Sequence, residues 1–197
     1  MSGPRIAVSG SAGTGKTSLG RHLARELGLP FVEEGMRARL EAGLDLHELG
    51  LEGWAALIEE LWEEHRAAQA AAPDGFVADR SSLDFAAFWL HYDLCALPER
   101  SADFLARMRA AAADYDLVVM LPWGALPLEH DGVRTTNPWV QLRFQLLVEG
   151  VSRKEIPAGR LLALEGAGSL EERARQVRSA LEAAGEQGRN GAGAPIP

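Results

Sequence analysis

The chain has 197 residues, of which 47% are hydrophobic and 24% charged, and its formal net charge is −8 at pH 7. That length and balance suit one globular domain with a substantial core. The negative charge disfavours a nucleic-acid surface, and no apolar stretch is long enough to cross a bilayer or to act as a signal peptide. Cys95 is the lone cysteine, which excludes an internal disulfide and fits a reducing cytosol. We therefore expect a cytoplasmic protein without membrane or nucleic-acid partners; its oligomeric state stays open.

Strand-like and helix-like segments alternate along the chain, which predicts a parallel sheet with helices on both faces. The expected strands are residues 5–9, 30–33, 75–79, 117–121 and 160–164. The expected helices are residues 16–27, 53–72, 82–94, 100–113, 139–151 and 170–184. Residues 1–184 thus predict a single three-layer α/β/α domain with a five-stranded parallel sheet. Residues 185–197 carry glycine and proline without apolar periodicity, so we expect a disordered tail.

The most informative motif lies between the first strand and the first helix. It matches the pattern G-x-x-x-x-G-K-[ST] and consists of Gly10, Ser11, Ala12, Gly13, Thr14, Gly15, Lys16 and Thr17. Backbone N–H groups at a helix N-terminus suit phosphate, and the glycines allow the chain to curl closely around it. We expect this phosphate loop, with Ser18 after it, to bind ATP. Lys16 would reach the β- and γ-phosphates, and the Thr17 hydroxyl would bind Mg²⁺.

Composition strengthens the interpretation of Lys16. Of the 20 basic residues only Lys16 and Lys154 are lysines, and the others are arginines. A lysine retained in this loop indicates that a compact ammonium is needed there, which a planar guanidinium would not supply.

Charged residues follow the second and third expected strands. Glu34 and Arg37 come after the second, and the third ends in Asp79 and Arg80. Because the carboxyl ends of parallel strands border the ligand crevice, we expect these side chains near the γ-phosphate. Glu34 or Asp79 would orient or deprotonate an attacking hydroxyl, Asp79 would also serve Mg²⁺, and Arg37 and Arg80 would hold the acceptor. The alternatives are an acidic helix start and a purely structural Asp–Arg pair.

The stretch after the fourth strand predicts a lid, because long irregular loops in compact domains often close over ligands. Arg134 is the first choice for a cation that closes over the phosphates, and Arg143 on the following helix is the second. We assign Asp131 to the acceptor site. Trp123 would stack on an aromatic acceptor, or simply pack.

Two charged features have plain structural explanations. Ser81 and Asp84 have capping-box spacing, so we leave Asp84 out of the chemistry. The helix expected at residues 53–72 has an apolar stripe that includes Trp62 and His65, which we expect to pack in the core. Its opposite face carries Glu59, Glu60, Glu63 and Glu64, and we expect that acidic face to be solvated.

A phosphate loop identifies a nucleotide site, not a reaction. The chain has no D-x-x-G and no N-K-x-D or T-K-x-D motif, which disfavours a switch GTPase. Its length also disfavours a ring-forming ATPase. The remaining class is a small-molecule kinase.

The chain resembles the ribosylnicotinamide-kinase-like P-loop family of small, AAA-type ATPase-like kinases, which includes the kinase domain of the bacterial NAD-biosynthesis regulator. Five features beyond the phosphate loop carry the resemblance: E-x-x-R at Glu34 and Arg37, the strand ending in Asp79, D-G-x-R at Asp131 to Arg134, R-x-Q at Arg143 and Gln145, and a late strand–Gly–helix unit around Gly166. They cover about residues 5–184 in the family's order. The triplet Asp79-Arg80-Ser81 is similar to the acceptor motif of deoxynucleoside and thymidylate kinases. The resemblance implies the P-loop NTPase fold with a helical lid.

We therefore expect an ATP- and Mg²⁺-dependent kinase acting on a hydroxyl of a nucleoside-like small molecule. Two alternatives remain. One is a regulatory ATPase module that works through a protein partner, for which the acidic face is the candidate surface. The other is a kinase of a modified base or nucleic-acid end.

Overall fold

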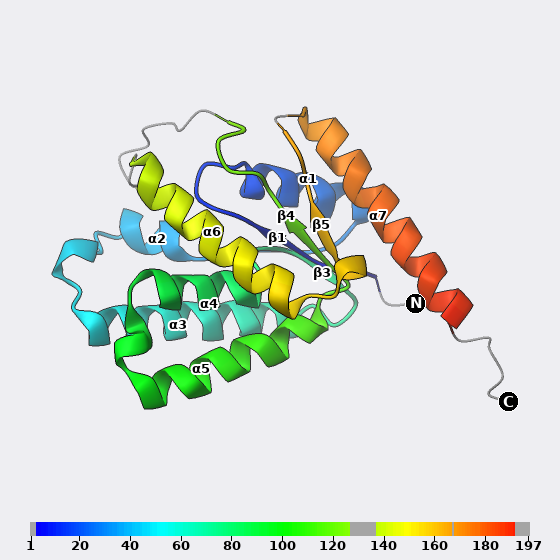
Figure 1. The fold of residues 1–197 in the computed structure, drawn as a ribbon. Coiled ribbons are helices and arrows are strands. Elements are labelled where there is room, and N and C mark those ends of the chain that lie inside the picture. The colour runs from blue at the N-terminus through cyan, green and yellow to red at the C-terminus, as the bar shows by residue number, and fades with distance from the viewer. Residues whose placement is uncertain (1–2, 127–136, 167, 192–197) are drawn as a thin grey trace, which may run out of the picture.

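The computed structural model describes residues 3–126, 137–166 and 168–191 (Figure 1). The strands are β1 Arg5–Ser9, β2 Phe31–Val32, β3 Phe76–Asp79, β4 Leu117–Met120 and β5 Leu161–Ala163. The helices are α1 Lys16–Leu27, α2 Met36–Glu41, α3 Leu51–Ala70, α4 Ser82–His91, α5 Pro98–Ala111, α6 Pro138–Glu155 and α7 Leu170–Gly191. Among the described residues, no helix is both long enough and apolar enough to cross a membrane.

The five strands form one parallel sheet in the order β2-β3-β1-β4-β5, which confirms the predicted sheet. Strand β1 is central. From it the chain builds outward to β3 and β2 on one side and to β4 and β5 on the other. The order therefore reverses beside the carboxyl end of β1, the point at which open α/β sheets bind their ligands. The phosphate loop begins at this point.

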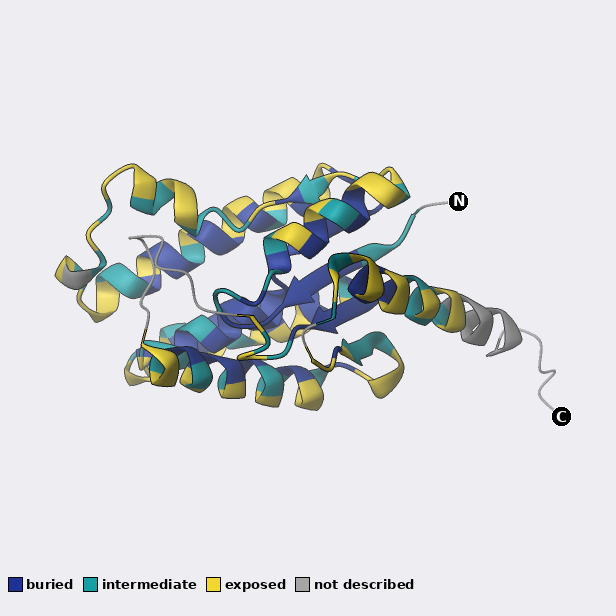
Figure 2. Cartoon of the chain, turned by 90° about the horizontal axis from the view of Figure 1, so that it is seen from above, coloured by how far each residue is buried: buried dark blue, intermediate teal, exposed yellow. Residues whose placement is uncertain are grey.

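Helices cover both faces of the sheet, and the alternation of strand residues decides what each face contacts (Figures 1 and 2). Ile6 and Val8 pack into a core with α1 and α7. Ala7, between them, points to the opposite face and packs with residues of α4 and β4. Helix α5 lies outside α4, so this side has an additional helical layer. In Figure 2 the sheet is buried between these layers.

Most differences from the sequence prediction concern helix ends. Helix α4 stops at His91, short of the predicted residue 94, because the chain turns through Asp93 in the left-handed region. Helix α2 was not predicted as an element of its own. Helix α7 continues to Gly191, so the expectation of disorder from residue 185 is wrong up to that point. Extending a formed helix is far easier than nucleating one, and it tolerates single glycines at a modest cost.

Candidate active site

The phosphate loop has the backbone that its glycines predict. Gly10, Gly13 and Gly15 have φ values of 134°, 77° and 88°, in the range that L side chains rarely adopt. At Gly10 a Cβ would also lie 3.1 Å from the carbonyl oxygen of Leu121. Gly15 is the N-cap of α1, so the loop ends on the free N–H groups of that helix. The loop is therefore built as an anion site.

Lys16 lies within this loop with only 7% of its surface exposed. Its Nζ donates to the carbonyl oxygen of Ser11 at 2.6 Å, which fixes the ammonium across the loop. Burial, reinforced by the nearby charge of Arg80, lowers the pKa of Lys16 to about 8. A bound phosphate would raise the pKa of Lys16 again, because it adds negative charge beside the buried ammonium.

Thr17 and Asp79 meet beside the loop. The Thr17 hydroxyl donates to Oδ2 of Asp79 at 2.5 Å, across the gap between α1 and the end of β3. A hydroxyl and a carboxylate at adjacent positions are the oxygen donors that Mg²⁺ takes, with the remainder from water and phosphate. The donor set therefore fits the ion expected from the sequence.

Glu34 and Arg80, the residue after Asp79, form an ion pair. Oε1 of Glu34 lies 3.2 Å from Nε of Arg80, and both side chains are largely buried. Arg80 Nη1 donates to the carbonyl oxygen of Gly10 at 3.2 Å, so the same guanidinium contacts the phosphate loop. Its charged carbon also lies 4.6 Å from the ring centre of Phe88 and 5.4 Å from that of Phe144. The geometry thus brings Glu34, Asp79 and Arg80 together, as predicted.

The backbone of Arg80 is unusual, with a φ of 86° in a residue that is not glycine. Such conformations cost energy and persist where the surroundings over-determine them, often at functional sites. Here the side-chain contacts of Arg80 with Glu34, Asp84 and Gly10 fix the residue from several directions.

Asp84 is a site residue that the sequence interpretation left out. It does form the expected capping box with Ser81, but it is also fully buried and reaches the phosphate loop. Its Oδ2 accepts from the Ser9 hydroxyl at 2.6 Å, and its Oδ1 accepts from Arg80 at 3.2 Å. The sequence signal for burial was the position of this carboxylate within the apolar run 83–90. The capping box explained the residue without burial, so the signal was not used.

His65 was assigned to the core stripe, and it is buried there between α3 and the sheet. Its two ring nitrogens, however, face two backbone carbonyls. Nδ1 lies 3.1 Å from the Glu33 oxygen and Nε2 3.2 Å from the Arg80 oxygen. The ring therefore lies between the ends of β2 and β3, the two segments that carry the acidic side chains, and as a neutral imidazole it donates its one N–H to one of the two carbonyls. Burial lowers the pKa of His65 below its ordinary value.

Two glutamines of α6 fasten the outer side of the phosphate loop. Gln145 accepts from the Ser11 N–H at 2.8 Å, and Gln141 accepts from the Ala12 N–H at 3.1 Å. Gln145 also donates to the Leu121 carbonyl at 2.9 Å, which ties the loop to the end of β4. Only Gln145 had a sequence signal, in the R-x-Q pattern.

The remaining predicted residues are less clearly placed at the site. Arg37 is half-exposed on α2 and lies 3.8 Å from Glu41, and Ser18 is exposed in the first turn of α1. Arg143 donates to the His91 carbonyl at 2.6 Å, so its geometry lends no support to a phosphate contact. Asp131 and Arg134, and with them most of the expected lid, lie outside the described residues.

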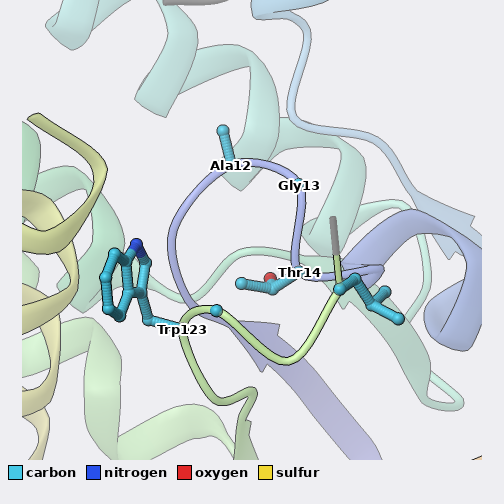
Figure 3. A pocket seen from close by; sticks show the side chains of 6 residues that line it. Ala12, Gly13, Thr14 and Trp123 are labelled. Atoms are coloured by element: carbon cyan, nitrogen blue, oxygen red, sulfur yellow. The ribbon is translucent and has the colours of Figure 1, made fainter. Parts of the chain in front are cut away.

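Trp123 lies next to the phosphate loop (Figure 3). It borders a cavity of about 180 Å³ between the loop and the segment after β4. The residues that line the cavity are Ala12, Gly13, Thr14, Trp123, Gly124 and Leu126.

Each of the four carboxylates on the acidic face of α3 has an arginine partner, while Glu60, Glu63 and Glu64 keep more than half of their side-chain surface exposed to solvent, as expected. Glu60 and Glu64 pair with Arg39 of α2, at 3.0 and 2.9 Å. Two arginines of α5 form ion pairs with the other two carboxylates, Arg100 with Glu59 at 2.6 Å and Arg107 with Glu63 at 2.7 Å. The sequence pattern could not show that α2 and α5 would lie alongside. The face therefore serves to join helices.

Comparisons with known proteins agree with this architecture. A NadR protein in complex with NR has a TM-score of 0.67 at 22% identity, covering 91% of this chain and 52% of that one. Deoxyadenosine kinase from M. mycoides has a TM-score of 0.62 at 12% identity, covering 91% and 99%. In sequence, cytidylate kinase of Fervidobacterium nodosum is 35% identical over 60 residues, 30% of this chain and 27% of that protein.

The structural similarities, all below 25% identity, show that the chain has the α/β P-loop fold of these kinases. The chain spans only about half the NadR protein and about a quarter of the cytidylate kinase. The family described as AAA domain matches residues 5–183, from β1 into α7. By that match the chain belongs to the AAA domain family.

Proposed function

We propose that the chain is an ATP- and Mg²⁺-dependent kinase that transfers the γ-phosphoryl group to a hydroxyl of a nucleoside-like small molecule. The observation that carries the proposal is that three contacts lie at the carboxyl ends of β1, β2 and β3. They are the contact of Lys16 with the phosphate loop, the hydrogen bond from Thr17 to Asp79, and the ion pair of Glu34 with Arg80. A phosphate site, a metal site and a carboxylate positioned by an arginine are the components of a site for phosphoryl transfer.

On the nucleotide side, the loop amides and Lys16 would hold the phosphates and stabilise charge on the transferring group. Thr17 and Asp79 would hold Mg²⁺, which supplies charge neutralisation for the phosphate oxygens when bound. Because Asp79 already accepts from Thr17, it suits the metal better than it suits proton abstraction. This leaves Glu34 as the preferred base.

On the acceptor side, Glu34 would accept the proton of the attacking hydroxyl while Arg80 holds the carboxylate in place. The acceptor class rests on the relatives. A NadR protein in complex with NR, a deoxyadenosine kinase and a cytidylate kinase all resemble this chain. Trp54 and Tyr92, stacked with ring centres 3.6 Å apart, offer an aromatic wall near Glu34 and Arg80 of the kind that suits a planar base.

The test is ADP release from Mg-ATP with a panel of nucleosides, ribosylnicotinamide included, and nucleoside monophosphates. We expect one compound to stimulate release strongly and to appear as a phosphorylated product by mass. Glu34→Gln should lower kcat by orders of magnitude with little change in ATP affinity, whereas Glu41→Gln, an exposed control on α2, should leave both unchanged. A slow rate that is the same for every compound would contradict the kinase and favour the regulatory module.

A further inference from the structure

Arg173, on the first turns of α7, differs from Arg178 and Arg80 in how its charge is balanced. Arg178 on the same helix pairs with Glu26, and Arg80 pairs with Glu34 and Asp84. Among the described residues no carboxylate lies within ion-pair distance of Arg173. The adjacent carboxylate, Glu172, instead accepts from the N–H of Ser169 at 2.7 Å.

The Arg173 side chain is nevertheless buried, with only 5% of its surface exposed. One nitrogen, Nη1, donates to the carbonyl oxygen of Thr14 at 3.2 Å. The other two, Nε and Nη2, are buried without a hydrogen-bond partner in the part of the chain that the structure describes. Buried charged donors are normally paired, because leaving them unmatched forfeits the hydration that they had in water.

The guanidinium also lies where the surrounding field is unfavourable. Its Nη1 is 3.3 Å from the position that a Cβ would take at Gly15, the N-cap of α1. The N-terminus of a helix carries partial positive charge and repels cations, and the ammonium of Lys16 follows directly in the chain. Leu126, the other neighbour of that Gly15 position, lines the cavity beside the phosphate loop.

We propose that Arg173 is a nucleotide-binding residue, a second fixed cation that α7 supplies to the phosphate loop. The phosphates of the bound nucleotide balance its charge, and their oxygens accept hydrogen bonds from Nε and Nη2. The inference rests on the proposed function only for the identity of the ligand as a nucleotide. Lys16 and Arg173 would then contact the phosphates from opposite ends of the loop, one from α1 and one from α7.

The experiment is calorimetric titration of the full chain with ADP and, separately, with pyrophosphate. Arg173→Gln keeps a donor for the Thr14 carbonyl and removes the charge, while Arg173→Lys keeps the charge. We expect Arg173→Gln to weaken both ligands by about ten-fold or more, because hydrogen bonds to charged groups are the stronger class. Arg173→Lys should retain most of the affinity, and Arg178→Gln, the matched control on the same helix, should bind like the unaltered chain.

Two results would overturn the proposal. One is unchanged affinity in Arg173→Gln. The other is an equal loss in Arg173→Gln and Arg173→Lys, which would indicate that packing of the guanidinium supports the loop. Thermal unfolding of each variant checks that the fold is intact. Charge-dependent ADP binding without any phosphorylated acceptor would contradict the proposed kinase and leave the assignment of Arg173 standing.

Discussion

Single buried cations at this site would be stabilised further by a bound phosphate, beyond the effect of the nearby carboxylates. Lys16 is the clearest example, because its ammonium is buried and its pKa is lowered to about 8 by that burial. Lys16 therefore carries its positive charge, which phosphate binding needs, near neutral pH and loses it at higher pH. The neighbouring Arg80, which contributes to the lowering, has its own pKa raised by the carboxylates of Glu34 and Asp84, against the effect of burial, and stays charged.

We predict that ATP affinity falls as pH rises above 8. Free Lys16 loses its proton there, so binding must also take up a proton, and the apparent Kd should be about ten-fold higher at pH 9 than its neutral-pH value. Calorimetry across pH 7–9.5 measures this. Lys16→Ala should bind weakly with a nearly flat profile, and a flat profile in the unaltered chain would contradict the assignment.

Asp84 provides a stability prediction. Asp84→Asn removes a buried carboxylate from Arg80 and from the Ser9 hydroxyl, and breaking such a pair costs about 3 kcal/mol. Urea unfolding measures the loss. The matched control is Asp103→Asn, whose carboxylate pairs with Arg107 on the exposed side of α5 and should matter by less than about 1 kcal/mol. Equal effects of the two substitutions would show that the buried network adds no stability.

Contacts between elements decide how the site is held. His65 lies between the ends of β2 and β3, and α6 holds the phosphate loop through its glutamines. Neither contact follows from the periodicity of one helix, because each depends on which elements lie next to each other in the sheet.

The buried His65 makes the free energy of unfolding decrease as the pH falls. Its folded pKa lies below the unfolded value of about 6.5, so the unfolded chain binds the extra proton first. The contribution of His65 is therefore complete above about pH 6.5 and declines as pH falls below it. Urea unfolding between pH 7.5 and 5 should show this decline, and His65→Gln should reduce its slope. His22→Gln, at a partly exposed position on α1, is the control and should keep the slope. An unchanged slope in His65→Gln would remove this explanation.

The glutamine contact of α6 predicts faster hydrogen exchange in the phosphate loop. Gln145→Leu leaves the Ser11 N–H without its acceptor, so the amide of Ser11 should exchange markedly faster while those of β1 stay protected. The same substitution at Gln176, exposed on α7, serves as the control. Unaltered protection at Ser11 would show that the loop holds its shape without α6.

At the scale of the whole molecule, the sequence predicted what depends on local pattern. The central strand Arg5–Ser9, the helix Lys16–Leu27 and the loop between them lie where the pattern placed them, since glycine positions and apolar alternation are local signals. The closeness of Glu34, Asp79 and Arg80 followed from one further rule, that carboxyl ends of parallel strands share an edge.

What the sequence did not show are contacts made across the fold. Asp84 looked like a cap, His65 like core, and Arg173 like part of a helix pattern, because nothing local in the chain records that each reaches the phosphate loop or the strand ends. The sequence likewise did not show that the acidic face of α3 has arginine partners. Its partners come from α2 and α5, and only the packed structure brings them together.

The most direct test of the central claim follows the γ-phosphoryl group itself. The chain would be incubated with Mg²⁺ and γ-labelled ATP together with the most stimulating nucleoside-like acceptor. A kinase delivers the label to the acceptor hydroxyl, and Lys16→Ala and Glu34→Gln should both abolish that product. Label found only in inorganic phosphate, whatever acceptor is supplied, would contradict the kinase and identify a nucleotide hydrolase.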